Sequence, residues 1–179
     1  MKFKVTSVRF VDKGLQGVIR RVLGLDTLSA RVGILGGTAD KIHPLRNTLT
    51  IGDVALMQEF GSSRAGIPQR SYLRSTKNEN HGKIFKGFYD VARQVVLQSI
   101  NPVAGLTQLG GRVAELVRLK ILSGDVAPQN APYTIERKGH GQTLQDTMTL
   151  SHSITNDVVV AKSTAGVNVA EGEQGTNAS

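Results

Sequence analysis

The amino-acid sequence predicts an α+β fold, in which a small, mostly antiparallel sheet packs against two to three longer helices. A long loop or arm and a flexible C-terminal tail complete the prediction. Three observations lead to it. Helical periodicity recurs through the middle of the chain, and strand-like alternation occurs only at widely separated positions. The third is size, because 39% apolar residues in a chain of 179 suffice for one core. We therefore expect a single domain at 1–162 and a tail at 163–179.

The first half of the chain predicts two helices, one strand and a loop. Apolar residues at steps of three and four predict an amphipathic helix over 11–24, and alternation predicts a short strand over 30–34. No period is visible over 36–48, which predicts a long loop or arm. A second helix follows, with Asp53 as its expected cap and Gly61 at its end.

The second half of the chain predicts two longer helices and a closing strand. Apolar periodicity covers 77–99 and 105–123, which Asn101-Pro102 separates, because proline disfavours a helical residue before it. Gly124 is expected to close the second of these helices. A helical turn at Pro132–Lys138 and a strand within 153–162 follow. The last residues, 163–179, contain few large apolar side chains, so a disordered tail is predicted.

Residue types and spacings predict neither an enzyme nor a cofactor site. The chain has no cysteine, which excludes disulfides, thiol nucleophiles and thiolate metal sites. The four histidines lack the HxxxH or HExxH spacing that places two imidazoles beside one metal ion. No window approaches the roughly 18 apolar residues of a membrane span, so no membrane partner is expected.

Charge is distributed unevenly along the chain. Residues 1–138 contain 21 lysines and arginines against 10 acids, a net charge of +11, whereas 139–179 contain one lysine against four acids, or −3. A basic body favours a polyanionic partner such as DNA. The alternative is that these basic side chains pair with a neighbouring subunit, and both interpretations stay open on charge alone.

The stretch QEFGSSRAGIPQRSYLRST, residues 58–76, combines an acid, an aromatic residue, glycines, a proline and three arginines. We predict that residues 70–74 are extended, which would place Arg70, Tyr72 and Arg74 on one side. Arginine and tyrosine are enriched where protein surfaces anchor each other. The alternative is a loop that Phe60 and Leu73 hold to its own core.

Two blocks of the sequence resemble a known family. EFGSS…GIPQRSYLR is similar to the HEFGT…IPARPFLR signature of the bacteriophage minor tail, tail-completion or neck proteins. The block LKILSGDVAPQNAPYTIERKGHGQTLQDTMTLSHSITNDVVV is similar to the C-terminal pattern of that family. The matching positions are Leu144, Asp146, Thr147, Leu150, Ser153 and Ile154. The chain departs from the family at Gln58, where histidine is common, and at Met148, where glycine is usual.

The resemblance implies a structural virion protein without catalytic activity, made in the bacterial cytoplasm and located at the head-to-tail junction. Its implied partners are further copies in a ring of six, or alternatively twelve, together with connector or head-closure proteins, tail-tube proteins and the genome DNA in the lumen. The implied subunit interface comprises Glu59, Phe60, Arg64, Pro68, Arg70, Tyr72 and Arg74. The main alternative is a basic nucleic-acid-binding protein of a phage or prophage, and a small hydrolase ranks third.

Overall fold

The structure is a computed structural model that describes residues 14–145 and 148–160. These residues form seven α-helices, one short 3-10 helix and two separate two-stranded antiparallel sheets, which confirms the α+β class. In chain order the elements are α1 (Leu15–Asp26), β1 (Leu28–Gly33), the 3-10 helix (Gly36–Thr38), β2 (Ile42–His43), β3 (Arg46–Thr50), α2 (Ile51–Phe60), α3 (Tyr72–Glu79), α4 (His81–Val96), α5 (Pro102–Ser123), α6 (Pro132–Lys138), α7 (Thr149–Ser153) and β4 (Thr155–Val160).

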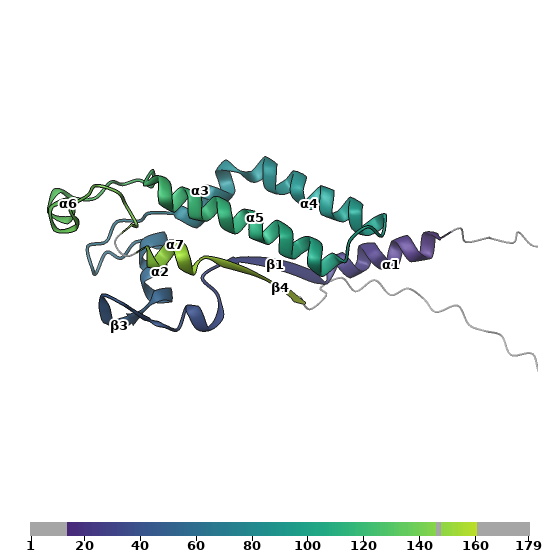
Figure 1. Cartoon of the computed structure of the whole chain (residues 1–179), viewed down its shortest axis with the longest axis horizontal. Coiled ribbons are helices and arrows are strands. Elements are labelled where there is room, and N and C mark those ends of the chain that lie inside the picture. Colours follow the sequence, from purple (N-terminus) through teal and green to yellow (C-terminus); the bar gives the residue numbers. More distant parts are fainter. Residues whose placement is uncertain (1–13, 146–147, 161–179) are drawn as a thin grey trace, which may run out of the picture.

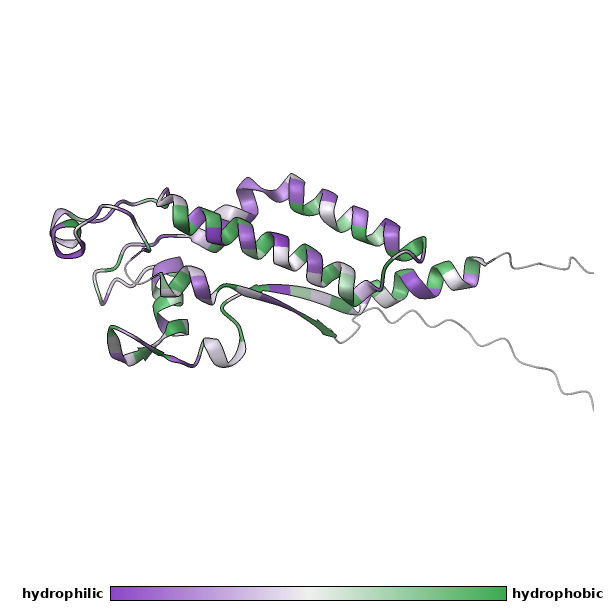
Figure 2. Ribbon diagram, viewed as in Figure 1, coloured by the Kyte–Doolittle hydropathy of each residue, from purple (hydrophilic) through white to green (hydrophobic). Residues whose placement is uncertain are grey.

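The long helix α5 lies at the centre of the fold, between α4 on one side and the β1–β4 sheet on the other (Figure 1). Strand β1 pairs antiparallel with β4, from Leu28 opposite Val160 to Gly33 opposite Thr155. α5 contributes to both apolar clusters. The larger cluster surrounds Tyr72 and Ile121, and the smaller joins Val91 and Val95 of α4 to α5 and is flanked by Leu28. Figure 2 shows hydrophobic residues along the side of α4 that faces α5 and hydrophilic residues along its outer side.

Glycines allow α4 and α5 to approach each other closely. A Cβ atom at Gly105 would lie 2.7 Å from Cγ1 of Val91, and one at Gly87 would lie 2.6 Å from Cδ1 of Leu109. Real Cβ atoms do not tolerate such distances, so a larger residue at either position would require the facing side chain of Val91 or Leu109 to move. The glycines inside these helices therefore serve packing between helices.

Several helix ends are set by side chains and by glycine. Asn101 Oδ1 accepts a hydrogen bond from the amide of Val103 at the start of α5, and Gly124 ends that helix with a φ of 68°, as the sequence predicts. The predicted N-cap of α2 is wrong, because the N-cap is Thr50, three residues before Asp53. Asp53 completes a capping box by accepting a hydrogen bond from the amide of Thr50.

Other predicted elements also differ from the structure. The helix predicted over 77–99 is two helices, because the chain breaks at Asn80 before α4 begins. The segment 36–48 is no free arm, because it contains β2 and part of β3. The amides of Ile51 and Gly52 also donate to the carbonyl oxygens of Lys41 and Ala39. The C-terminal strand is preceded by α7, so it begins two residues later than predicted.

Some predictions fall on positions that the structure does not describe. These are residues 11–13 of the first predicted helix, the tail at 163–179, and the pair Asp146 and Thr147 of the resemblance, all outside residues 14–145 and 148–160. The predicted start of that helix is wrong at Gly14, which has a left-handed conformation, so α1 begins at Leu15.

Candidate functional site

The 58–76 stretch forms the end of α2, a turn and the start of α3. Residues 70–74 are not extended as predicted, because α3 begins at Tyr72. The turn is closed by paired backbone hydrogen bonds between Ser62 and Ile67, which have N–O distances of 2.8 and 2.9 Å. Residues on either side of the turn are thereby brought together.

Glu59 stabilises the start of α3. Its side chain is only 4% exposed. The carboxylate accepts hydrogen bonds from Ser71 Oγ at 2.6 Å, from the amide of Leu73 at 2.8 Å and from the amide of Arg74 at 3.2 Å. The first amides of a helix have no partner inside the helix, and a negative charge at that end is favourable. Glu59 therefore acts as a cap supplied by the preceding helix.

Tyr72 is fully buried and belongs to the larger apolar cluster. Its hydroxyl has no hydrogen-bond partner among the described residues. Burial raises the pKa of Tyr72, and the nearby charge of Glu59 raises it further. Tyr72 is thus a core residue rather than an exposed anchor.

Arg70 is buried and joins the two sequence blocks that carry the resemblance. Its Nε donates to the carbonyl oxygen of Pro128 at 2.9 Å, and its terminal nitrogens donate to Gln58 Oε1, to the carbonyl oxygen of Gln129 and to Asn130 Oδ1, each at 3.4 Å. Burial lowers the pKa of this guanidinium. The two blocks, some 58 residues apart along the chain, are therefore fastened to each other.

These findings correct the predicted interface in part. Glu59, Arg70 and Tyr72 are buried, and the first two make their hydrogen bonds within the chain, so they do not face a neighbouring subunit. Alternation along residues 70–74 predicted an exposed position for Arg70 and Tyr72. Local alternation contains no information about the distant loop that covers Arg70 or the core that surrounds Tyr72.

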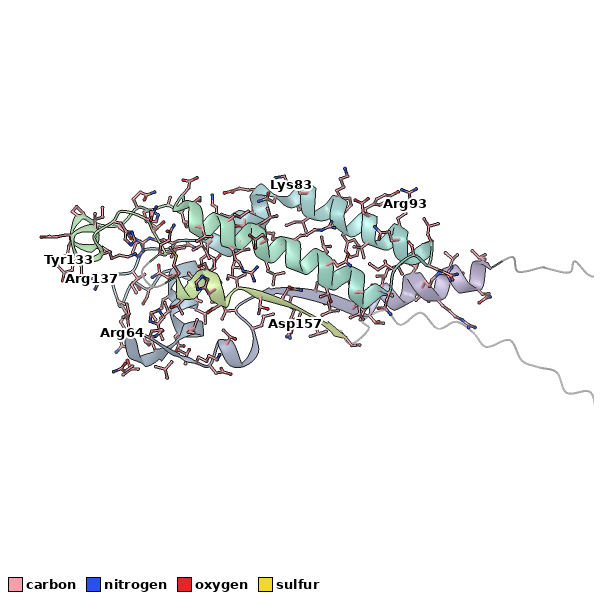
Figure 3. The ribbon with its side chains drawn as sticks, in the orientation of Figure 1. Arg64, Lys83, Arg93, Tyr133, Arg137 and Asp157 are labelled. Atoms are coloured by element: carbon pink, nitrogen blue, oxygen red, sulfur yellow. The ribbon has the colours of Figure 1, made fainter. Side chains whose placement is uncertain are left out.

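The other predicted interface residues are exposed. Phe60 is 62% exposed, and the Arg74 guanidinium lies over its ring, 6.0 Å from the ring centre. Arg64 and Pro68 lie on the surface of the turn, and Figure 3 shows Arg64 at the outside of the molecule. Their place in a subunit interface stays a prediction.

A large apolar groove is the main candidate site. It has a volume of about 1040 Å³ and is lined by residues of β1, α2, α3, α4 and α5. Leu109 and Val113 of α5 line it, and so do residues of β1, a strand that pairs only with β4 within residues 14–145 and 148–160. Leu56 and Phe60 of α2 border it on one side. Its volume lies at the upper end of the usual range for small-molecule pockets, about 300–1,000 Å³.

Aromatic and basic side chains surround this groove. Phe85 and Phe88 of α4 line it and are exposed, Phe85 to 67%, and the ring of His81 stacks on that of Phe85 with a centroid distance of 6.4 Å. Arg74 and Lys77 of α3 line it as well and are also exposed. Exposed aromatic residues beside an apolar depression are typical of protein-binding surfaces.

The sequence of α4 contains one signal of this groove, which the prediction did not use. Phe85 and Tyr89 widen the apolar arc of α4 beyond the face that Val91 and Val95 turn toward α5. A helix that packs on one neighbour needs only one apolar stripe. The wider arc therefore indicates a second contact surface on the groove side of α4.

No metal or membrane feature accompanies the groove. Across residues 14–145 and 148–160, no group of three or more histidine, aspartate or glutamate side chains is placed to hold a metal ion. Within the same ranges, no helix has both the length and the apolar character needed to cross a membrane.

No protein-family model matches the chain, and no curated protein or solved structure is significantly similar to it.

Proposed function

We propose that this chain is a structural virion protein of a tailed bacteriophage, which forms a ring at the head-to-tail junction and joins the capsid connector to the tail. In this role it contributes surfaces rather than chemistry. Its partners are further copies of itself, the neighbouring connector and tail-tube proteins, and the genome that passes through the lumen.

The observation that carries the proposal is the apolar groove with its aromatic border. Monomeric proteins rarely expose contiguous apolar patches of more than a few hundred Å², and larger ones mark interaction sites. The resemblance then supplies the kind of assembly. Its two blocks contact each other through Arg70, so they belong to one structural unit.

The charge distribution also supports assembly into a ring. A closed ring of identical chains requires that one surface of each copy meets a different surface of the next. The net charge of the sequence is +11 over residues 1–138 and −3 over residues 139–179, and opposite charges would favour contact between unlike parts of two copies.

The proposal is tested with phage particles from a host that lacks this protein. We expect filled heads and finished tails that do not join, and electron microscopy of wild-type particles should show a ring of six or twelve copies at the junction. Supplying the protein from a plasmid should restore joining. Infectious particles of normal structure without the protein would contradict the proposal.

A basic nucleic-acid-binding protein is the second candidate, and one observation favours it. Lys83, Lys86 and Arg93 are exposed on the outer side of α4, and Figure 3 shows Lys83 and Arg93 pointing away from α5. Salt-dependent DNA binding by the isolated protein tests this candidate. Binding tighter than the non-specific range of about 10⁻⁴–10⁻⁶ M, weakened when all three residues become glutamine, would favour it over the junction role.

A further inference from the structure

Helix α1 presents a second apolar surface. Leu15, Ile19, Val22 and Leu23 are all exposed, and their spacing places them along one side of the helix. We call these four residues the α1 stripe. The other side of α1 packs against α4 and β1, where Leu25 joins the smaller apolar cluster. The helix is therefore apolar on two sides, and only one of them is covered within the described part of the chain.

The α1 stripe does not fill the groove of its own chain. No residue of α1 lines the groove. α1 ends at Asp26 and β1 begins at Leu28, so the helix is held at the end of that strand. Figure 1 shows α1 extending beyond the β1–β4 sheet, away from α2 and α3.

We propose that the α1 stripe of one copy docks into the apolar groove of the next copy. This inference rests on the proposed ring and names the two surfaces that build it. An amphipathic helix that lays its apolar face into a hydrophobic groove is a recurrent mode of protein recognition, with anchors at i, i+4 and i+7. Leu15, Ile19 and Val22 have this spacing, and Phe60, Phe85 and Phe88 of the groove supply aromatic contacts.

Charge is compatible with this contact. Asp26 is exposed and continues the spacing of the stripe at its C-terminal end. Arg74 and Lys77 are the exposed basic residues that line the groove. Arg21 of α1 is only half-buried and Arg20 is exposed, but both lie outside the stripe. An acid within the docking surface and bases in the receiving surface give the contact a preferred direction.

These observations favour a second copy of this chain as the occupant of the groove, because every copy carries one α1 stripe and one groove. The two surfaces are different, so each contact is heterologous. It leaves one stripe and one groove free until a ring closes. Closure then covers all stripes and grooves at once.

Two variants of the full chain separate the two surfaces. Ile19→Asp blocks the stripe and leaves the groove intact, whereas Phe85→Asp blocks the groove and leaves the stripe intact. We expect each to weaken self-association at least about tenfold in sedimentation measurements. Leu119→Asp is the matched control, because Leu119 is exposed on α5 but does not line the groove. Circular dichroism should confirm that all three variants fold.

Mixing the variants gives the decisive result. Ile19→Asp and Phe85→Asp together contain one intact stripe and one intact groove, so the mixture should form a 1:1 heterodimer and no larger species. Each variant alone should stay monomeric. A mixture that remains monomeric, self-association that neither substitution weakens, or a wild-type chain that stays monomeric up to millimolar concentration would overturn the inference.

Cysteine cross-linking provides a second measurement, because the natural chain has no cysteine. A chain with Val22→Cys and Phe85→Cys should give a ladder of oligomers on oxidation, whereas Val22→Cys with Leu119→Cys should not. A disulfide formed within one monomer of the first variant would overturn the docking between copies.

If virions still contain the ring when Ile19→Asp is introduced, this inference fails and the junction role remains. If particles without the protein are normal, the junction role fails and the docking of copies is still decided by the mixture.

Discussion

Replacing Glu59 tests whether this residue caps α3 or anchors a neighbouring subunit. In Glu59→Ala the amides of Leu73 and Arg74 and the hydroxyl of Ser71 lose their acceptor. Loss of a helix cap costs about 0.5–2 kcal/mol, and a buried donor without a partner costs about 1–3 kcal/mol. Because the side chain is 4% exposed, water replaces the carboxylate poorly, and we expect the free energy of unfolding to fall by about 3 kcal/mol.

Urea denaturation followed by circular dichroism measures this loss. Glu59→Gln keeps one acceptor oxygen and the shape of the side chain, but its NH2 group faces a donor that loses its acceptor, so it should cost about 1–3 kcal/mol. Glu79→Ala is the matched control: this exposed glutamate is 2.9 Å from Lys120, and its loss should cost no more than about 1 kcal/mol. If Glu59→Ala changes stability by less than about 0.5 kcal/mol yet alters the state of assembly, the capping argument is refuted and the predicted interface is restored.

Three further substitutions test other features of the fold. Tyr72→Phe removes a buried hydroxyl that has no hydrogen-bond partner in the described part of the chain, so stability at neutral pH should stay the same or rise. Because burial raises the pKa of Tyr72, the folded chain keeps a proton that the unfolded chain releases. Wild-type stability should therefore fall faster than that of Tyr72→Phe above about pH 10, by up to about 1.4 kcal/mol per pH unit. Met148 has a φ of 56°, so Met148→Gly should stabilise the chain by up to about 1 kcal/mol in thermal unfolding, whereas Met148→Ala should not. Two hydrogen bonds from Thr50 lower the pKa of Asp53, and the bond from the Thr50 amide has a larger effect than the bond from its hydroxyl. This contribution is present above the unfolded pKa of about 3.9 and is lost as pH falls through the folded pKa, so Asp53→Asn should reduce the acid sensitivity of unfolding.

The sequence by itself determined the fold class and most helices. Periodic apolar residues and glycine stops are local signals, and they located α5, its end at Gly124 and the short helix α6. In the family that the sequence resembles, glycine is usual at the position of Met148. Met148 has a left-handed backbone conformation, which glycine adopts more easily than other residues, so this preference has a local reason. Such features depend on a few neighbouring residues and need no knowledge of the rest of the chain.

Tertiary structure alone decided which residues of the 58–76 stretch are buried. The alternation of residues 70–74 is compatible with an exposed strand, but the carboxylate of Glu59 caps a helix there, and the carbonyl oxygens of residues 128–129 accept from Arg70. The same holds for the groove, whose walls come from five elements spread between β1 and α5. The energy of burying a side chain depends on what the fold brings against it, and residues far apart in the sequence decide that.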